Sequence, residues 1–231
     1  MGKLSSVSFF CPAYNDEDNL PVLIPNVHKL LSEIAEKFEI IIIEDRSPDK
    51  TGEMADTLAK KFSNTRVIHH KENRGYGGAL KRGFQASKYD YIMYTDGDNQ
   101  YDINEFKPYL HLLKNVDVLT AYVDEKAVSM QRKIQSIIYN FLVKILFFTN
   151  IKDINCSLKI YKKEVVKNME IKCNSAFIDG EMLIKARRMG YKIKQFRATH
   201  YRRTAGAASG SKAYVVLETI KDMLKFRLGV L

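Results

Sequence analysis

Three carboxylates fall within seven positions of the stretch YIMYTDGDNQYD, residues 91–102, directly after an aromatic and aliphatic run suited to a strand. Asp96 and Asp98, separated by Gly97, can present two carboxylates to one cation from a tight turn. Hard oxygen ligands select Mg²⁺ or Mn²⁺, which keep open positions for water and substrate phosphates, and Gln100 can add a carbonyl oxygen. The spacing therefore predicts a divalent cation site. The alternative is a polar turn in which an aspartate caps the following helix.

Carboxylates also follow two earlier strand-like runs. The first run ends in CPAYND, which supplies Asp16, and the second, EIIIIED, supplies Glu44 and Asp45. An ionised carboxylate after four isoleucines is costly unless it is hydrogen-bonded, and nucleobase N–H groups are suitable donors for Asp45. An Asx-type turn in DRSPDKTG, residues 45–52, is the alternative and is compatible with base binding. Because the chain has a net charge of +10, this acidic rim indicates a bound cation.

Two loops carry groups suited to phosphate binding. In ENRGYGGALKRGF, residues 72–84, glycines that include Gly75 lead into a helix start, where backbone N–H groups can hold a phosphate. The spacing matches neither common phosphate-loop pattern, and close packing of this loop beside a ligand explains it equally well. The run THYRRTAGAASGSK places Arg202, Arg203 and Lys212 among small residues, which suits clamping of a pyrophosphate. A solvated basic loop is the alternative.

A further acidic pair precedes an amphipathic helix in SAFIDGEMLIKARRMGYKI, where Asp179 and Glu181 stand at the helix start. Charge compensation at the N-terminus of a helix explains both residues without any chemistry. Asp179 is nevertheless the candidate general base for a reaction that has to remove a proton from its acceptor.

The elements that must position these groups follow from the apolar periodicity. Strand-like and helix-period runs alternate along the first half of the chain, which predicts right-handed crossovers and a single α/β domain with a mostly parallel central sheet flanked by helices. The expected strands are 7–11, 39–44, 66–69, 89–95 and 116–122, and the expected helices lie within 19–38, 51–62, 77–87 and 103–114. In such sheets ligands bind outside the carboxyl ends of the strands, where the carboxylates fall.

Composition narrows the partner and the compartment. The 37 Lys and Arg residues against 27 Asp and Glu residues favour an anionic partner, whether nucleic acid, an acidic membrane face or a phosphorylated small molecule. Segment 134–148 is apolar around most of its girth and is predicted to lie in a membrane interface, with a core or dimer-interface helix as the alternative. Three cysteines without metal-like spacing, and no apolar signal-peptide core, predict a reduced cytoplasmic protein.

Six motifs together resemble a known family. The ordered set CPAYND, IIIEDRSPDKT, NRGYGGALKRGF, YTDGDNQYD, FIDGEMLIKARRMGYKI and HYRRTAG is similar to the family 2 glycosyltransferases with a GT-A (Rossmann-like) fold. More narrowly it resembles their dolichol-phosphate mannose synthase-like branch, which transfers sugars from nucleotide donors to polyprenyl phosphates. The resemblance implies a nucleotide-sugar and metal-binding half over about residues 5–125, and an acceptor-side half over about 126–231 with an interfacial and a C-terminal helix.

The resemblance also assigns roles to residues of this sequence. The implied donor-binding set, in which Asp45 reads the base, is Pro12, Tyr14, Asp16, Glu44, Asp45, Gly75, Asp96, Gly97 and Asp98. The implied ligands of Mg²⁺ or Mn²⁺ are Asp96, Asp98 and Gln100. The implied acceptor-phosphate set is Arg132, Ser136 and Arg203, and the catalytic set is Asp98, Arg132, Asp179 and Arg203.

The implied reaction is an inverting, metal-dependent transfer of a hexose from a GDP- or UDP-sugar to a polyprenyl (dolichyl or undecaprenyl) phosphate at the cytoplasmic face of a membrane. The metal and Arg203 would stabilise the leaving nucleoside diphosphate. A phosphate acceptor, with a second pKa of about 6, is largely dianionic at neutral pH, so Arg132 need only neutralise and orient it. A sugar or protein hydroxyl acceptor would instead need a base, for which Asp179 is the candidate.

Two other functions remain open at this point. A glycosyltransferase that acts on a hydroxyl acceptor shares every donor-site feature. A non-enzymatic nucleic-acid-binding protein would use the same net charge, but the basic residues are dispersed and no nucleic-acid-binding motif occurs. The departures from the family pattern concern mainly the acceptor side, since Ala121 stands where relatives often have Arg, and Ser209 where they have Lys.

Overall fold

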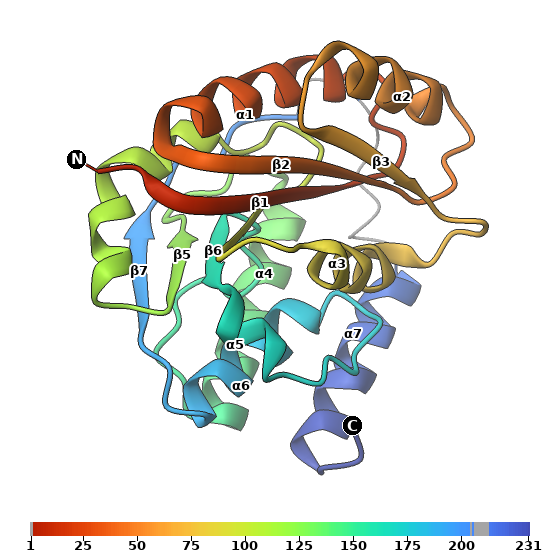
Figure 1. Ribbon diagram of the computed structural model, residues 1–231. Helices are drawn as coiled ribbons and strands as arrows, with labels where there is room; N and C mark the ends of the chain where they lie inside the picture. The colour runs from red at the N-terminus through yellow and green to blue at the C-terminus, as the bar shows by residue number, and fades with distance from the viewer. Residues whose placement is uncertain (1, 204, 206–212) are drawn as a thin grey trace.

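The computed structural model describes residues 2–203, 205 and 213–231. The described residues form one seven-stranded sheet with the strand order β3-β2-β1-β4-β6-β5-β7 (Figure 1). Its strands are β1 (Leu4–Ala13), β2 (Ala35–Glu44), β3 (Thr65–His69), β4 (Tyr91–Tyr94), β5 (Val118–Tyr122), β6 (Lys159–Lys162) and β7 (Ile193–Arg197). The helices are α1 (Leu20–Ile34), α2 (Thr51–Lys61), α3 (Gly75–Ala86), the 3₁₀ helix η1 (Ile103–Lys114), α4 (Met130–Phe147), α5 (Lys163–Lys167), α6 (Ile178–Arg188) and α7 (Ala213–Arg227).

Helices cover both faces of the sheet, as the isoleucine run in β2 predicts. Helices α1, α2 and η1 pack on one face, and α3 to α7 pack on the other (Figure 1). Successive strand side chains point to opposite faces, so Ile40 and Ile42 join the core under α1 while Ile41 and Ile43 join the core over α3. All four are fully buried, which explains why the strand lacks the polar alternation of a half-exposed one.

The predicted mostly parallel sheet is confirmed, with one exception in its middle. Strands β3, β2, β1 and β4 run parallel, as do β5 and β7, whereas β6 is antiparallel to both of its neighbours. The five expected strands are present. Strands β6 and β7 were not predicted, because each has only four or five residues and carries two or more polar side chains. Neither shows an apolar run that could be distinguished from a loop.

The first helix-period segment, 19–38, contains α1, which ends at Ile34, and its last four residues belong to β2, which begins at Ala35. Residues 35–38 pair with β1 in the register Leu4 opposite Ala35 and Val7 opposite Phe38. The inter-strand hydrogen bonds gained there outweigh the helical period of the local sequence. The predicted helix over 103–114 is a 3₁₀ helix that contains Pro108, whose missing N–H cannot serve an α-helical ladder.

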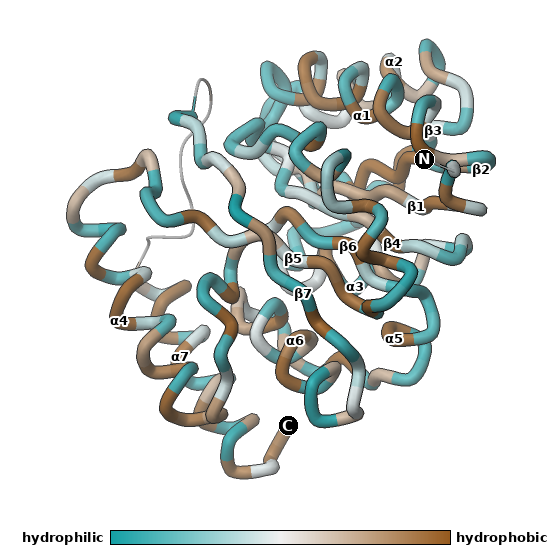
Figure 2. The backbone as a smooth tube through the Cα atoms, turned by 90° about the vertical axis from the view of Figure 1, so that its left-hand side faces the viewer, coloured by the Kyte–Doolittle hydropathy of each residue, from teal (hydrophilic) through white to brown (hydrophobic). Residues whose placement is uncertain are grey.

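Helix α4 and helix α7 lie side by side at one edge of the molecule (Figure 2). Each keeps a row of apolar side chains in solvent, and the row on α4 comprises Met130, Ile134, Ile137, Ile138, Phe141 and Ile145. In the part of the chain that the structure describes, no helix is long and apolar enough to cross a bilayer. The three cysteines, Cys11, Cys156 and Cys173, are buried and free.

Candidate active site

The carboxyl ends of β1, β2 and β4 meet at one edge of the sheet, because the three strands are adjacent and parallel. Asp16 follows β1, Asp45 follows β2, and Asp96 follows β4. The Asp45 N–H donates to the Ala13 carbonyl oxygen at 3.1 Å, which ties the ends of the first two strands together. The structure thus brings together the carboxylates that the strand ends were expected to present.

The chain turns sharply at each of these strand ends. Asn15, Arg46 and Asn99 adopt left-handed backbone conformations, with φ values of 58°, 58° and 55°. A non-glycine residue in this region stores roughly 1–3 kcal/mol of strain and is found where the surrounding structure requires it. One such residue follows each of the three strands.

The D-x-D pair lies at this rim and is less buried than Asp16, Glu44 and Asp45. The Asp96 N–H donates to Ser157 Oγ at 3.2 Å, and its Oδ1 is buried without a hydrogen-bond partner among the described residues. Burial, together with the negative charges of Asp98 and Asp179, raises the pKa of Asp96 to about 7. Asp98 accepts a hydrogen bond from the Arg203 guanidinium. The site therefore holds more negative charge than its own cations offset.

These residues fit a divalent cation. The Gln100 amide donates from Nε2 to the Tyr201 carbonyl oxygen at 3.1 Å, and its Oε1 accepts no hydrogen bond from a described residue. Together with Asp96 Oδ1 and the Asp98 carboxylate it makes an oxygen-only donor set, which suits Mg²⁺ or Mn²⁺. Among the described residues no group of three or more His, Cys, Asp and Glu side chains could hold a metal, so coordination would have to be completed by water and substrate oxygens.

Asp16 organises the loop after β1. Its carboxylate accepts hydrogen bonds from the Tyr14 N–H at 3.0 Å and from Asn19 Nδ2 at 2.8 Å, while its own N–H donates to Thr51 Oγ1 at 2.8 Å. Burial raises the pKa of Asp16 against the effect of these hydrogen bonds. The loop leaves the Tyr14 ring exposed at the rim, where it is available to a ligand.

Asp16 also limits what can follow β4. A Cβ atom on Gly97 would lie 2.8 Å from the Pro12 carbonyl oxygen, closer than real Cβ atoms approach, and 3.0 Å from Asp16 Oδ2, which is tighter than most Cβ contacts. The turn can therefore pass this close to β1 only because its central residue is glycine. This contact places Pro12, Asp16 and Gly97 together, as the donor-site prediction expected.

Gly97→Ala tests this close approach. Because neither neighbour can retreat, we expect the substitution to displace the D-x-D turn, to lower kcat/KM at least about tenfold and to lower the free energy of unfolding by about 1–3 kcal/mol. Steady-state kinetics and urea denaturation measure the two effects. Gly52→Ala is the matched control, because a Cβ there meets its nearest atom at an ordinary 3.7 Å. Wild-type activity and stability in Gly97→Ala would contradict the packing described.

The loop before α3 donates a backbone hydrogen bond to Asp45 instead of presenting that N–H to a phosphate. The Arg74 N–H donates to Asp45 Oδ1 at 2.9 Å, and the Gly75 N–H donates to Asn73 Oδ1 at 3.1 Å, so both N–H groups are already used within the protein. Gly75 has a φ of 69°, which only glycine adopts without strain. The loop thus lies beside the expected base site, as its alternative reading of close packing next to a ligand predicts.

The acceptor-side residues are grouped around the start of α4. Ser136 Oγ accepts a hydrogen bond from Lys126 Nζ at 3.1 Å, and the same ammonium pairs with Asp153 at 2.9 Å. Burial and the nearby charges of Lys126 and Arg132 lower the pKa of His200. Arg132 and Ser136 therefore lie near two further basic side chains, Lys126 and His200, which were not predicted. His200 belongs to the HYRRTAG motif but was given no role there, and Lys126 belongs to none of the six motifs.

Asp179 lies deeper than its predicted role required. Its Oδ1 accepts a hydrogen bond from the fully buried Lys159 ammonium at 2.5 Å and another from the Tyr94 hydroxyl, and its Oδ2 accepts one from the Tyr76 hydroxyl at 3.0 Å. Lys159 was not predicted, because a lysine in a short strand gives no sequence signal. A base function for Asp179 stays a prediction, while the contacts describe a buried ion pair beneath the D-x-D turn.

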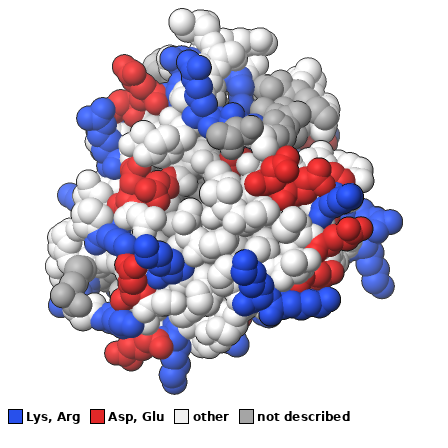
Figure 3. Space-filling view, turned by 90° about the horizontal axis from the view of Figure 1, so that it is seen from above, with Lys and Arg blue, Asp and Glu red and all other residues white. Residues whose placement is uncertain are grey.

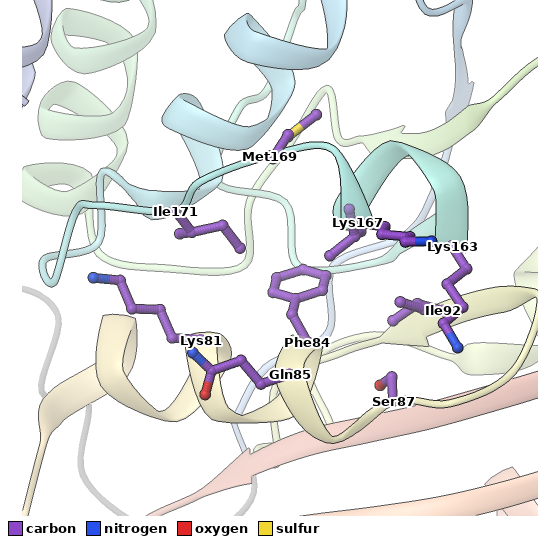
Figure 4. A pocket seen from close by; sticks show the side chains of 10 residues that line it. Lys81, Phe84, Gln85, Ser87, Ile92, Lys163, Lys167, Met169 and Ile171 are labelled. Carbon is purple, nitrogen blue, oxygen red and sulfur yellow. The ribbon is translucent and has the colours of Figure 1, made fainter.

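The described residues do not include Lys212, Ser209 or the glycine of the R-x-x-G loop. A cavity of about 290 Å³ opens between α3 and α5, with Phe84 and Ile92 on its floor and Lys81 and Lys163 at its rim (Figure 4). Its lining contains none of the predicted site residues.

Comparison with known proteins agrees with this geometry. The chain matches the family model described as glycosyl transferase family 2 over residues 8–169. It is 30% identical over 202 residues to glycosyltransferase AglD of Haloferax volcanii, which covers 82% of this chain and 32% of that protein. It is also 30% identical over 182 residues to a dolichyl-phosphate beta-glucosyltransferase of Dictyostelium discoideum, which covers 71% of this chain and 56% of that protein. The chain thus spans about a third and about half of these two relatives.

A solved structure shares the fold. Glucosyl-3-phosphoglycerate synthase from Mycobacterium tuberculosis, crystallised with Mn²⁺, UDP and glucosyl-3-phosphoglycerate, is similar with a TM-score of 0.74 at 18% identity, over 97% of this chain and 80% of that chain. The seven-stranded sheet flanked by helices therefore has the expected GT-A architecture. The chain belongs to glycosyl transferase family 2.

Proposed function

We infer that this chain transfers a hexose from a nucleotide-sugar to a polyprenyl phosphate, with inversion at the anomeric carbon. The observation that supports the proposal is the contact of Arg203 with Asp98 in the D-x-D turn, which follows β4 at the carboxyl edge of the sheet. The Dictyostelium relative, named for its action on dolichyl phosphate, supports the acceptor class. The Mn²⁺ and UDP of the mycobacterial structure support the donor class and the metal.

The donor would lie across the ends of β1, β2 and β4. Asp45 would accept from the base, and Asp96, Asp98 and Gln100 would hold Mg²⁺ or Mn²⁺. When bound, such a cation neutralises the diphosphate and so makes it a better leaving group. Arg203 keeps its Nε–H without a partner among the described residues, so it can donate to the same diphosphate as negative charge develops on it.

The acceptor would lie on the opposite side of Arg203, at the start of α4. Arg132 and Lys126 supply positive charge there, and Ser136 supplies a hydroxyl. A phosphate monoester needs orientation and charge neutralisation but no base, since it is already largely dianionic above its second pKa of about 6. This suits the arrangement better than a hydroxyl acceptor does, because both oxygens of Asp179, the base candidate, are engaged in the buried ion pair and its tyrosine contacts.

The basic net charge is not gathered into a nucleic-acid-binding face on the side of the molecule seen in Figure 3. Lysine and arginine side chains there are interspersed with aspartate and glutamate. A nucleic-acid-binding surface would instead present a continuous basic patch that tracks a phosphate backbone. The charges on this face therefore support a small phosphorylated substrate over a polyanion.

A lipid acceptor places the protein at a membrane, and we propose the cytoplasmic face. The exposed apolar row on α4 is continued on its neighbour α7 by Tyr214, Leu217 and Leu224, and by Leu228 directly after the end of α7. Both helices are coloured largely as apolar in Figure 2. Basic residues on the same helices, among them Lys144 and Lys221, would be attracted to anionic lipid headgroups. The two rows can enter the interface while the start of α4 faces the acceptor phosphate.

The double variant Ile137→Glu with Phe141→Glu tests the membrane contact. Both side chains are exposed, so the fold should persist. Each loses roughly 1.5–3 kcal/mol of apolar burial on membrane binding, and we expect cosedimentation with vesicles that contain anionic lipid to weaken at least tenfold. Val22→Glu is the matched control, because Val22 is an exposed apolar residue on α1, away from α4 and α7. Equal vesicle binding by the double variant and the wild type would exclude this contact.

The transfer itself can be followed with radiolabelled UDP- and GDP-hexoses, Mn²⁺ or Mg²⁺, and a short polyprenyl phosphate in detergent. The proposal predicts label in the lipid fraction with the phosphate and none with the corresponding polyprenol. Label that moves only to sugar or peptide hydroxyls would shift the proposal to a hydroxyl-directed transferase. Neither transfer nor hydrolysis of any donor would contradict the proposed function.

A further inference from the structure

Two acids at the end of β2 face two histidines at the end of β3. The strands pair in parallel with Glu44 opposite His69, so each acid contacts its own histidine. Glu44 Oε2 lies 3.0 Å from His69 Nδ1, and Asp45 Oδ1 lies 2.6 Å from His70 Nδ1. The pairs differ in their surroundings. The His69 side chain is half-exposed and also contacts Asp56, whereas the side chains of His70 and Asp45 are each only 4% exposed.

The two oxygens of the Asp45 carboxylate are used differently. Oδ1 accepts two hydrogen bonds, from His70 Nδ1 and from the Arg74 N–H at 2.9 Å, which occupy both of its lone pairs. Oδ2 accepts none from the described residues. Asp45 therefore offers a ligand one free acceptor oxygen instead of the usual two.

The His70 ring donates a hydrogen bond to Asp45. A carboxylate only accepts hydrogen bonds, so the ring must donate from Nδ1. His70 Nε2 is buried and has no partner among the described residues, which leaves the bond to Asp45 as the one polar contact that we find for the ring. A buried polar atom without a partner is uncommon and costly. Its presence here indicates that the ring is retained for what it does to Asp45.

One free oxygen discriminates between nucleobases. Uracil presents a single N–H donor, at N3, between two carbonyl acceptors, whereas guanine presents two adjacent donors, from N1 and the exocyclic amine. A carboxylate with both oxygens free can accept both guanine donors, but one with a single free oxygen satisfies only the uracil edge. The second guanine donor would be left without its partner, which lowers affinity by about tenfold or more.

We propose that His70 is a positioning residue that selects a uridine donor over a guanosine donor by occupying Asp45 Oδ1. The inference rests on the proposed function, because it requires that Asp45 faces the base of a nucleotide. It narrows the donor to a UDP-sugar. The Arg74 N–H belongs to the same arrangement, since the glycine turn at Gly75 directs that N–H onto the same oxygen.

Binding of UDP, GDP and N3-methyl-UDP in the presence of Mn²⁺, measured by calorimetry, tests the inference. We expect UDP to bind at least about tenfold more tightly than GDP and than N3-methyl-UDP, which lacks the single donor. His70→Ala should bring the UDP-to-GDP affinity ratio toward one. His70→Asn, whose side-chain amide can donate from nearly the same position, should restore the ratio. His69→Ala, the matched control on the neighbouring pair, should keep the wild-type ratio.

The outcomes separate the inference from the proposed function. If UDP and GDP bind equally well, or if N3-methyl-UDP binds like UDP, the role of His70 is wrong while nucleotide binding stands. A His70→Ala variant that loses affinity but keeps the wild-type ratio would show that the histidine serves only the local fold, and this too would overturn the inference. If no nucleotide binds in the presence of Mn²⁺, the proposed function itself fails.

Discussion

Asp98→Asn is expected to reduce sugar transfer by about 10²–10³-fold or more, the largest loss that we predict from a single substitution. The asparagine keeps the shape of the side chain and removes its charge. That charge pairs with Arg203, and in the proposed function it would also attract the divalent cation. Losing it would remove one proposed metal ligand and free the guanidinium from its proposed place beside the diphosphate. Initial rates with a labelled donor, measured over a range of Mn²⁺ concentrations, report the effect.

Asp102→Asn is the matched control for this variant. Asp102 is an exposed carboxylate four residues along the same loop, and its Oδ1 accepts the Asn104 N–H at 2.9 Å to cap η1. Asparagine caps helices about as well as aspartate, so the control should keep nearly wild-type activity. The capping function that was the alternative explanation for the acidic cluster thus belongs to Asp102. Equal activity of Asp98→Asn and the wild type would remove Asp98 from the catalytic account.

Lys159→Met is expected to destabilise the protein by about 3–5 kcal/mol, because it leaves the buried carboxylate of Asp179 without its counter-charge. Both side chains are essentially inaccessible to solvent. A typical domain has only about 5–15 kcal/mol of stability, so this loss would be evident as a large shift of the urea midpoint. Urea denaturation followed by circular dichroism measures it.

The neighbouring strand position provides a matched control. Lys162, also in β6, pairs with Asp117 at 2.9 Å where both side chains are partly exposed, and such pairs contribute about 0–1 kcal/mol. Lys162→Met should therefore change stability little. Lys159→Met combined with Asp179→Leu should recover most of the loss, because no buried charge is left unpaired. A midpoint for Lys159→Met that equals the Lys162→Met midpoint would show that Asp179 is not ionised beside Lys159.

The fold could be predicted wherever the apolar residues within one segment are sufficient to identify a strand or a helix. The isoleucine run of β2 and the alternation of strands with helix-period segments are sufficient for a parallel sheet covered on both faces. Strand β6 could not be predicted, since one of its four residues, Lys159, is a lysine that is buried only because Asp179 lies across from it. The boundary at Ala35 was equally hidden, because it depends on pairing with β1.

The candidate site likewise has features that could be predicted from the sequence and features that could not. Carboxylates at strand ends could be read from the sequence, because a parallel sheet brings those ends to one edge. Partners from distant parts of the chain could not. His70 is 25 residues from Asp45, and Lys126 is 27 residues from Asp153. No local pattern links such pairs.

The distribution of charge explains why a basic protein keeps an acidic rim. The overall charge of +10 favours the approach of phosphorylated substrates, whereas the D-x-D turn gathers uncompensated carboxylates at the sheet edge. A diphosphate could approach Asp96 and Asp98 only together with a cation that makes the local charge positive. Donor binding should therefore depend on metal even in the absence of an acceptor.

Calorimetric titration of UDP into the wild-type protein, with excess Mn²⁺ and again with EDTA, tests this dependence most directly. It needs neither the sugar nor the acceptor to be known. We predict saturable binding with Mn²⁺ and binding weakened at least about 100-fold with EDTA, because the carboxylates then repel the diphosphate. Binding of equal strength under both conditions would contradict a metal-held diphosphate at Asp96 and Asp98.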